Sequence, residues 1–240
     1  MTEFWGVDFQ NHSKKETLKI INDYLIGDNS RKSLIIVTLN PELLLFAEKD
    51  NAYKNILNKA DLKNIDGFGI KLMGWFKKRN VSERIAGVDL ARHVLKSSIK
   101  NNLKTAFVFR KDGLSNLKDI EKFSNNFQAD IKCIEYNLKK EGISEEINSQ
   151  LQDREVILVG IGAPYQEKFI SENKKNWPNL KLAIGIGGTF DFWTGRQRRA
   201  PKFMRKIGLE WLWRFLARPN RFWKIWKSTI VFMYKSLIRY

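Results

Sequence analysis

The sequence contains very few of the side chains that build metal centres and nucleophilic triads. Its 240 residues include one cysteine, Cys133, and two histidines, His12 and His93. A single cysteine excludes an internal disulfide, and so few Cys and His side chains argue against an all-protein zinc site. Neither histidine lies beside a sequence signature of a serine or cysteine nucleophile, so the sequence does not indicate a catalytic triad.

The sequence also lacks an Asp-x-Asp pair and any long apolar run. Many enzymes that use nucleotide sugars hold a divalent metal on such a pair, so we expect no metal and no other cofactor. Cations or backbone dipoles would then hold a diphosphate. The longest uncharged stretch, Val156–Gln166, has 11 residues, far fewer than the ~18 that a membrane-spanning helix needs. Because the first residues also show no signal-peptide pattern, we expect a protein that is not integral to a membrane.

Positive charge, by contrast, is abundant and unevenly distributed. The chain has 43 Lys and Arg residues against 26 Asp and Glu residues, a formal net charge of +17. Residues 196–240 alone hold 13 basic residues, one acidic residue and ten aromatic residues. A basic, aromatic tail on a nearly balanced body predicts a segment that docks on a polyanion, either nucleic acid or an anionic membrane surface.

Short β-rich runs alternate with helical patterns over most of the chain. The predicted strands are residues 34–38, 62–65, 105–109, 131–136, 156–160 and 180–186. This alternation predicts an α/β fold with a mostly parallel, Rossmann-like sheet and flanking helices. From about Arg199 onward the pattern is helical only, so we divide the chain into an α/β catalytic body, 1–198, and a helical appendage, 199–240.

Polar and glycine residues gather where four of the predicted strands end. They are Thr38 and Asn40, then Asp66 and Gly67, then residues 160–166, and finally residues 185–191. In open parallel sheets, ligands bind outside the carboxyl ends of the strands. The arrangement therefore predicts a ligand site at this edge of the sheet.

Two of these segments are glycine-rich turns between a strand and a helix, residues 160–167 and 185–191. Glycine lets backbone amides approach a phosphate, and a helix N-terminus favours anions. The alternative is a pair of tight turns that need a positive φ, with Asp191 as an ordinary helix cap. Tyr165 replaces the third glycine of the dinucleotide fingerprint, which argues against a dehydrogenase.

Two charged residues are candidates for a site at this edge. Asp66 could act as a general base, although most Asp-Gly pairs are ordinary turns. Arg84 precedes a helix for which we predict Asp89 as the N-cap. It could clamp a phosphate or carboxylate, or form a surface pair with an aspartate.

Taken in order, these motifs resemble the WecG/TagA/CpsF glycosyltransferases from about residue 5 to residue 226. The matching segments are Thr38–Pro41, Asp66–Gly69, Arg84–Leu90, Gly160–Glu167, Gly187–Phe192, Gly195, Arg199–Pro201, Gly208–Trp211, Arg214 and Pro219–Arg221. The resemblance implies transfer of a sugar from UDP to a polyprenyl-diphosphate-linked N-acetylglucosamine, with inversion and without a metal. The sugar would be N-acetylmannosamine or a derivative, or alternatively a glucose-type sugar.

The resemblance also implies roles for individual residues. Asp66 matches the general base, and Thr38, Asn40 and Gln166 match polar groups near the donor sugar and the acceptor. The implied substrate-binding residues are Arg84, Gly162, Gly187, Gly188, Asp191, Arg214 and Arg221. Such enzymes work on cell-wall or surface polysaccharide, including teichoic acid, as peripheral proteins at the cytoplasmic face of the plasma membrane.

The tail itself predicts an amphipathic helix from Trp223 onward. Its basic side holds Lys224, Lys227, Lys235 and Arg239, and its apolar side holds Trp223, Trp226, Ile230, Met233 and Leu237. We expect this helix to lie in the plane of an anionic membrane. The alternative for this helix is a terminal helix packed on the sheet. The alternatives for the whole protein are a membrane-recruited scaffold and a nucleic-acid-binding α/β protein, in which basic residues should line a groove.

Overall fold

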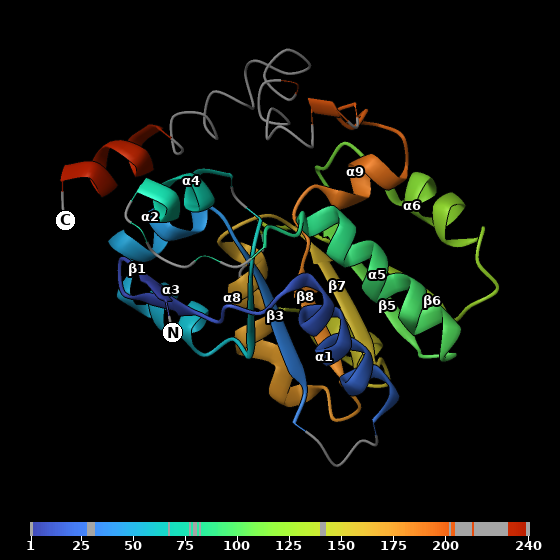
Figure 1. The fold of residues 1–240 in the computed structure, drawn as a ribbon. Coiled ribbons are helices and arrows are strands. Elements are labelled where there is room, and N and C mark those ends of the chain that lie inside the picture. The colour runs from blue at the N-terminus through green and yellow to red at the C-terminus, as the bar shows by residue number, and fades with distance from the viewer. Residues whose placement is uncertain are drawn as a thin grey trace.

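The computed structural model describes residues 2–27, 32–66, 68–76, 78, 81, 83–139, 143–201, 203–204, 213 and 230–238. At the centre of this part of the chain lies a six-stranded parallel sheet between two layers of helices (Figure 1). The strand order is β4-β3-β8-β7-β5-β6. The strands are β3 (Leu34–Leu39), β4 (Leu62–Ile65), β5 (Thr105–Arg110), β6 (Ile131–Tyr136), β7 (Val156–Gly160) and β8 (Leu182–Gly185). The predicted parallel α/β fold is confirmed, with each strand inside or within one residue of its predicted run.

Each face of the sheet packs against its own apolar core. Along β3, Ile35 and Val37 face one core while Leu34 and Ile36 face the other, as the two-residue period of a strand requires. The first core is covered by α2 (Pro41–Lys49), α3 (Asn51–Asn58), α4 (Phe68–Phe76), α7 (Glu145–Leu151) and α8 (Tyr165–Asn173). The second is covered by α1 (Lys14–Ile26), α5 (Gly87–Lys100), α6 (Leu117–Ser124) and α9 (Thr189–Trp193).

Local capping fixes where several helices begin. Ser13 and Glu16 form the predicted capping box at the start of α1. The Asn40 side chain accepts hydrogen bonds from the backbone N–H groups of Glu42 and Leu43, and Pro41 opens α2. The predicted N-cap of α5 was wrong: Ala86 occupies that position, and Asp89 lies within the first turn.

An N-terminal hairpin, absent from our sequence prediction, packs on the first core. Its strands are β1 (Thr2–Phe4) and β2 (Val7–Phe9), and Trp5 and Gly6 between them both adopt a positive φ, 56° and 80°. A tryptophan rarely adopts this conformation. Trp5 is nevertheless buried, and its ring centroid lies 4.9 Å from that of Phe232 near the C-terminus.

The C-terminal helix, residues 230–238, packs on the body instead of extending into solvent (Figure 1). Phe232 is fully buried in the first core, and the Lys235 ammonium lies 2.7 Å from a carboxylate oxygen of Glu48 on α2. Ile230 and Leu237 of the predicted apolar side are exposed, whereas Met233 packs partly against the core. The remaining residues of the predicted membrane helix, Trp223, Lys224, Trp226, Lys227 and Arg239, lie outside the described residues. Within the described ranges, no helix is long and apolar enough to cross a bilayer.

Candidate active site

Asp66 and Thr38 lie together at the carboxyl ends of the neighbouring strands β4 and β3. The Asp66 backbone N–H donates to the Leu39 carbonyl at 2.9 Å, which continues the strand pairing one residue beyond β4. A Cβ added to Gly87, the first residue of α5, would lie 3.1 Å from Asp66 Oδ2 and 3.5 Å from Thr38 Cγ2. The absence of a side chain at Gly87 therefore lets the N-terminus of α5 approach both predicted site residues.

Arg84 binds Asp66 directly. Its Nε donates to the Asp66 carbonyl oxygen at 2.5 Å, and Nη2 lies 3.7 Å from carboxylate Oδ1. The side chains of Arg84 and Asp66 are 20% and 29% exposed, so both remain accessible from the edge of the sheet. The structure thus pairs Arg84 with Asp66, and pairs Asp89 with Arg199. The predicted contact of Arg84 with a phosphate or carboxylate stays a prediction.

Thr38 connects this corner to the middle of the sheet. Its hydroxyl donates to the Gly185 carbonyl at 3.4 Å, at the end of β8. The side-chain oxygen of nearby Asn40 is engaged in capping α2. Its amide nitrogen is the group of Asn40 that is suited to a substrate.

Gln166 holds the second glycine-rich turn in place from within the protein. The side chain is buried: its oxygen accepts from the Gly187 N–H at 2.9 Å, and its nitrogen donates to Glu167 at 2.6 Å. A Cβ on Gly185 would lie 2.6 Å from the same nitrogen. Gln166 therefore shapes the loop after β8, and its predicted contact with substrate stays a prediction.

The glycine-rich turns contain the backbone conformations that require glycine. Gly162 has a φ of 86° and Gly187 a φ of 51°, values that other residues adopt only with strain. Gly188 forms the N-cap of α9. A Cβ on Gly160 would lie 2.5 Å from the Phe190 ring, so a glycine there admits the close approach of α9. Whether these turns hold phosphate stays a prediction.

Asp191 connects α9 to the loop after β5. The carboxylate oxygen Oδ1 accepts hydrogen bonds from the Ser115 N–H at 3.2 Å and from the Ser115 hydroxyl at 2.9 Å. Strands β5 and β7 are neighbours in the sheet. The chain continues from β5 to β6 on one side of this pair and from β7 to β8 on the other side, so the two connections run in opposite directions. The structure thus places Asp191 at a topological switch point, and its predicted nucleotide contact stays a prediction.

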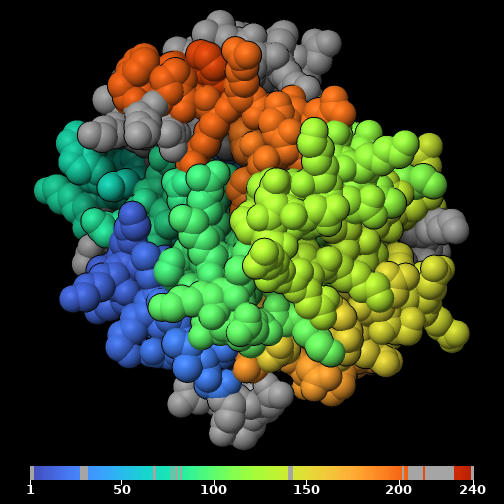
Figure 2. Space-filling model, turned by 90° about the vertical axis from the view of Figure 1, so that its right-hand side faces the viewer, coloured from blue at the N-terminus to red at the C-terminus, as the bar shows by residue number. Residues whose placement is uncertain are grey.

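Two arginines hold the segment after α9 against the helices of the second face. Arg196 makes two hydrogen bonds to the Asp119 carboxylate on α6, at 2.6 and 2.8 Å, and Arg199 makes two to Asp89 on α5, also at 2.6 and 2.8 Å. Figure 2 shows orange C-terminal residues adjoining the green part of the body at one end of this face. The predicted diphosphate-binding arginines that follow it, Arg214 and Arg221, lie outside the described residues.

Glu167, to which the sequence analysis assigned no role, is a buried carboxyl behind the site. It accepts hydrogen bonds from the Tyr53 hydroxyl at 2.9 Å and from Gln166. Burial raises the pKa of the Glu167 carboxyl and also raises the pKa of the Tyr53 phenol. Tyr53 lies on α3, 114 residues away in sequence, so local spacing gave no sign of this pair.

Glu167 should make the folded state less stable as the pH rises. A carboxyl whose pKa is higher in the folded than in the unfolded state adds stability below its unfolded pKa of ~4.3, and that stability is lost as pH rises through the folded pKa. Glu167→Gln should therefore melt at a higher temperature than the parent chain at pH 8 and gain nothing at pH 4. Melting curves across that range test this, with exposed Glu146→Gln as the control. Parallel curves for Glu167→Gln and the parent chain would contradict the raised pKa.

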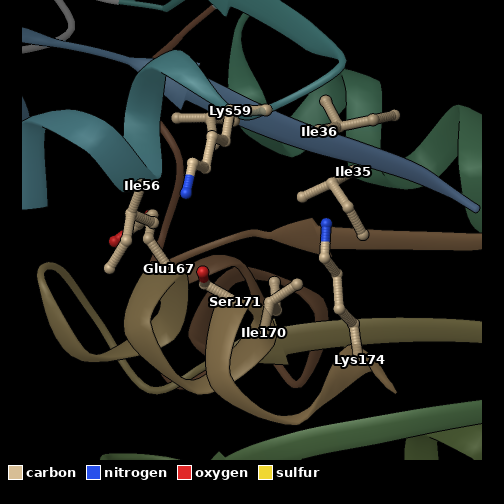
Figure 3. Close-up of a pocket in the computed structure, with 10 residues that line it drawn as sticks. Ile35, Ile36, Ile56, Lys59, Glu167, Ile170, Ser171 and Lys174 are labelled. Carbon is tan, nitrogen blue, oxygen red and sulfur yellow. The ribbon is translucent and has the colours of Figure 1, made fainter.

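A cavity of about 20 Å³ lies between α3, α8 and β3, with Ile35, Lys59 and Lys174 in its lining (Figure 3). This volume holds one or two water molecules and cannot hold a sugar nucleotide. Among the residues that the structure describes, no three His, Cys, Asp or Glu side chains are grouped closely enough to bind a metal ion. The accessible edge around Asp66 is therefore a better candidate for the reaction site than this cavity.

Sequence comparison places the chain among known proteins. The profile described as "Glycosyl transferase WecG/TagA/CpsF family" matches residues 2–240. The chain belongs to this family. Among its relatives is the N-acetylglucosaminyldiphosphoundecaprenol N-acetyl-beta-D-mannosaminyltransferase of Staphylococcus aureus strain MRSA252, 29% identical over 237 residues, which cover 96% of this chain and 89% of the relative. The protein of the same name from strain NCTC 8325 / PS 47 matches with the same identity and coverage. The WecG/TagA/CpsF family protein described here is thus a glycosyltransferase.

Proposed function

We propose that the protein transfers N-acetylmannosamine, or a derivative of it, from a UDP-sugar to a polyprenyl-diphosphate-linked N-acetylglucosamine. The name of the Staphylococcus aureus relatives supports the sugar and the acceptor. The observation that carries the proposal is the position of Asp66. A solvent-accessible carboxylate lies at the carboxyl edge of the sheet, between Arg84, Thr38 and the N-terminus of α5.

In this proposal Asp66 acts as the general base. It takes the proton from the acceptor hydroxyl as that oxygen forms a bond to C1 of the donor sugar. The bond from C1 to the phosphate oxygen breaks on the opposite face, and its electron pair leaves with UDP. A direct displacement of this kind inverts the anomeric centre.

Arg84 and the backbone at this edge would stabilise the charge of the departing diphosphate. A guanidinium offers paired N–H donors to phosphate oxygens, and a helix N-terminus adds a partial positive charge. Arg84 lies close enough to Asp66 to position the carboxylate as well as the substrate. These groups support a mechanism that needs no metal. A lipid-linked acceptor supports a peripheral location at the membrane, and we propose its cytoplasmic face.

A panel of donors tests this function. The full chain should transfer from UDP-N-acetylmannosamine to a short-chain polyprenyl-diphosphate-N-acetylglucosamine at least tenfold more efficiently than from UDP-glucose or UDP-N-acetylglucosamine. Specific polar contacts to the correct sugar can supply such discrimination. Excess EDTA should leave kcat unchanged, and NMR of the product should show the inverted anomer. Preference for a glucose-type donor, or a strict need for added Mg²⁺, would overturn the corresponding part of the proposal.

A further inference from the structure

The C-terminal end of α4 carries an exposed aromatic pair. Trp75 is 73% exposed and Phe76 is 57% exposed, and their ring centroids lie 5.0 Å apart, so they form one continuous apolar surface. The opposite side of the same helix is anchored, because Ile70 and Met73 are fully buried in the first core. Single exposed apolar residues need no explanation, but an exposed tryptophan in contact with an exposed phenylalanine does.

Two exposed lysines flank this pair along the chain. Lys71 lies on the exposed side of α4, and Lys78 follows the helix and is also exposed. In the sequence, Trp75 and Phe76 are followed directly by Lys77, Lys78 and Arg79. Aromatic side chains at the headgroup level beside several basic residues are typical of a segment bound to an anionic membrane surface.

We propose that the end of α4, with the exposed Lys71 and Lys78 beside it, inserts its aromatic pair into the headgroup region of an anionic bilayer. This inference rests on the proposed function, because a lipid-linked acceptor requires the site to reach the membrane. Helix α4 begins two residues after Asp66 and rises about 12 Å over its nine residues. An anchored tip therefore holds the carboxylate close to the surface at which the diphosphate of the acceptor lies.

The C-terminal helix presents a second apolar surface that fits the same arrangement. Its exposed side chains are Ile230, Tyr234, Leu237 and Ile238, spaced as one face of a helix. Figure 1 shows α4 and this helix on the same side of the molecule, and both pack on the first core. The two surfaces would contact one bilayer together, so loss of one should weaken binding without abolishing it.

Sedimentation with vesicles tests the proposal on the full chain. The double variant Trp75→Ala/Phe76→Ala should bind phosphatidylcholine vesicles containing phosphatidylglycerol at least tenfold more weakly than the parent chain. Lys71→Glu and Lys78→Glu each reverse one charge, and each should weaken binding by at least fivefold. Ile26→Ala is the matched control: Ile26 is 69% exposed but ends α1, close to the start of β3 and thus at the opposite edge of the sheet from Asp66.

Activity on two acceptors separates this proposal from its alternatives. With a long-chain acceptor embedded in vesicles, the turnover of the double variant should fall in proportion to its loss of vesicle binding. With a soluble short-chain acceptor, its turnover should equal that of the parent chain. Unchanged vesicle binding would overturn the proposal, as would an equal loss on both acceptors. A change in oligomeric state by analytical ultracentrifugation with unchanged vesicle binding would assign the pair to a second copy of the chain. Failure of the parent chain to turn over either acceptor would instead reject the proposed function, and the vesicle results would still stand.

Discussion

Replacing Asp66 by asparagine should lower kcat by roughly 10²–10⁴-fold and change the affinity for UDP by less than about twofold. Asparagine keeps the shape of the side chain but cannot accept the proton of the acceptor hydroxyl. It also keeps the backbone carbonyl to which Arg84 donates. The arginine should therefore remain in place, which separates loss of the base from loss of the neighbouring cation.

Two measurements make the Asp66 result decisive. Titration calorimetry gives the affinity for UDP, and single-turnover kinetics with saturating donor give the rate of transfer itself. Asp23→Asn is a suitable control, because Asp23 also pairs with a cation but lies on the exposed surface of α1. A near-normal kcat for Asp66→Asn would show that Asp66 is a turn residue held by Arg84.

The strands of the sheet were predictable because the sequence pattern that indicates each strand lies within the strand itself. Strands β3, β5, β7 and β8 are short, mainly apolar and buried runs, and parallel strands need helical crossovers between them. The starts of α1 and α2 were predictable for the same reason, since Ser13 and Asn40 act within three residues of themselves. Helix α4 was not predicted: glycines at 69 and 74 weaken the helical pattern, and the helix is stabilised by burial of Ile70 and Met73.

The candidate site was predictable in its position but not in its internal contacts. The carboxyl ends of parallel strands meet at one edge, so Thr38, Asp66 and the loop after β8 were expected together. The sequence could not show that the Gln166 side chain forms hydrogen bonds with Gly187 and Glu167 inside the protein. Contacts of this kind depend on side chains brought together by the tertiary fold.

The C-terminal helix shows the same limit most clearly. The helical wheel separated a basic side from an apolar side, yet the residues that anchor the helix, Phe232 and Ser236, lie between those two sides. Lys235, predicted to face lipid headgroups, has Glu48 as a partner within the chain. The partner surface for Phe232 is the N-terminal hairpin, which the sequence pattern also did not predict.

Replacing Phe232 by alanine should lower the free energy of unfolding by about 3–5 kcal/mol, the usual cost of truncating a fully buried phenylalanine. The variant loses the ring contacts with Trp5 and Phe4 and leaves a cavity between the hairpin and the C-terminal helix. Urea unfolding measures the change. Leu237→Ala, in the same helix but 59% exposed, should change stability by less than about 0.5 kcal/mol.

The outcome for Phe232 bears on how the appendage works. A loss below about 1 kcal/mol would mean that the helix contributes little to folding and is free to leave the body. The expected large loss would mean that removing the tail damages the body itself, so the membrane role must be tested with substitutions on the exposed face. Packing and membrane contact do not conflict, because Phe232 points inward while Leu237 and Ile238 remain exposed.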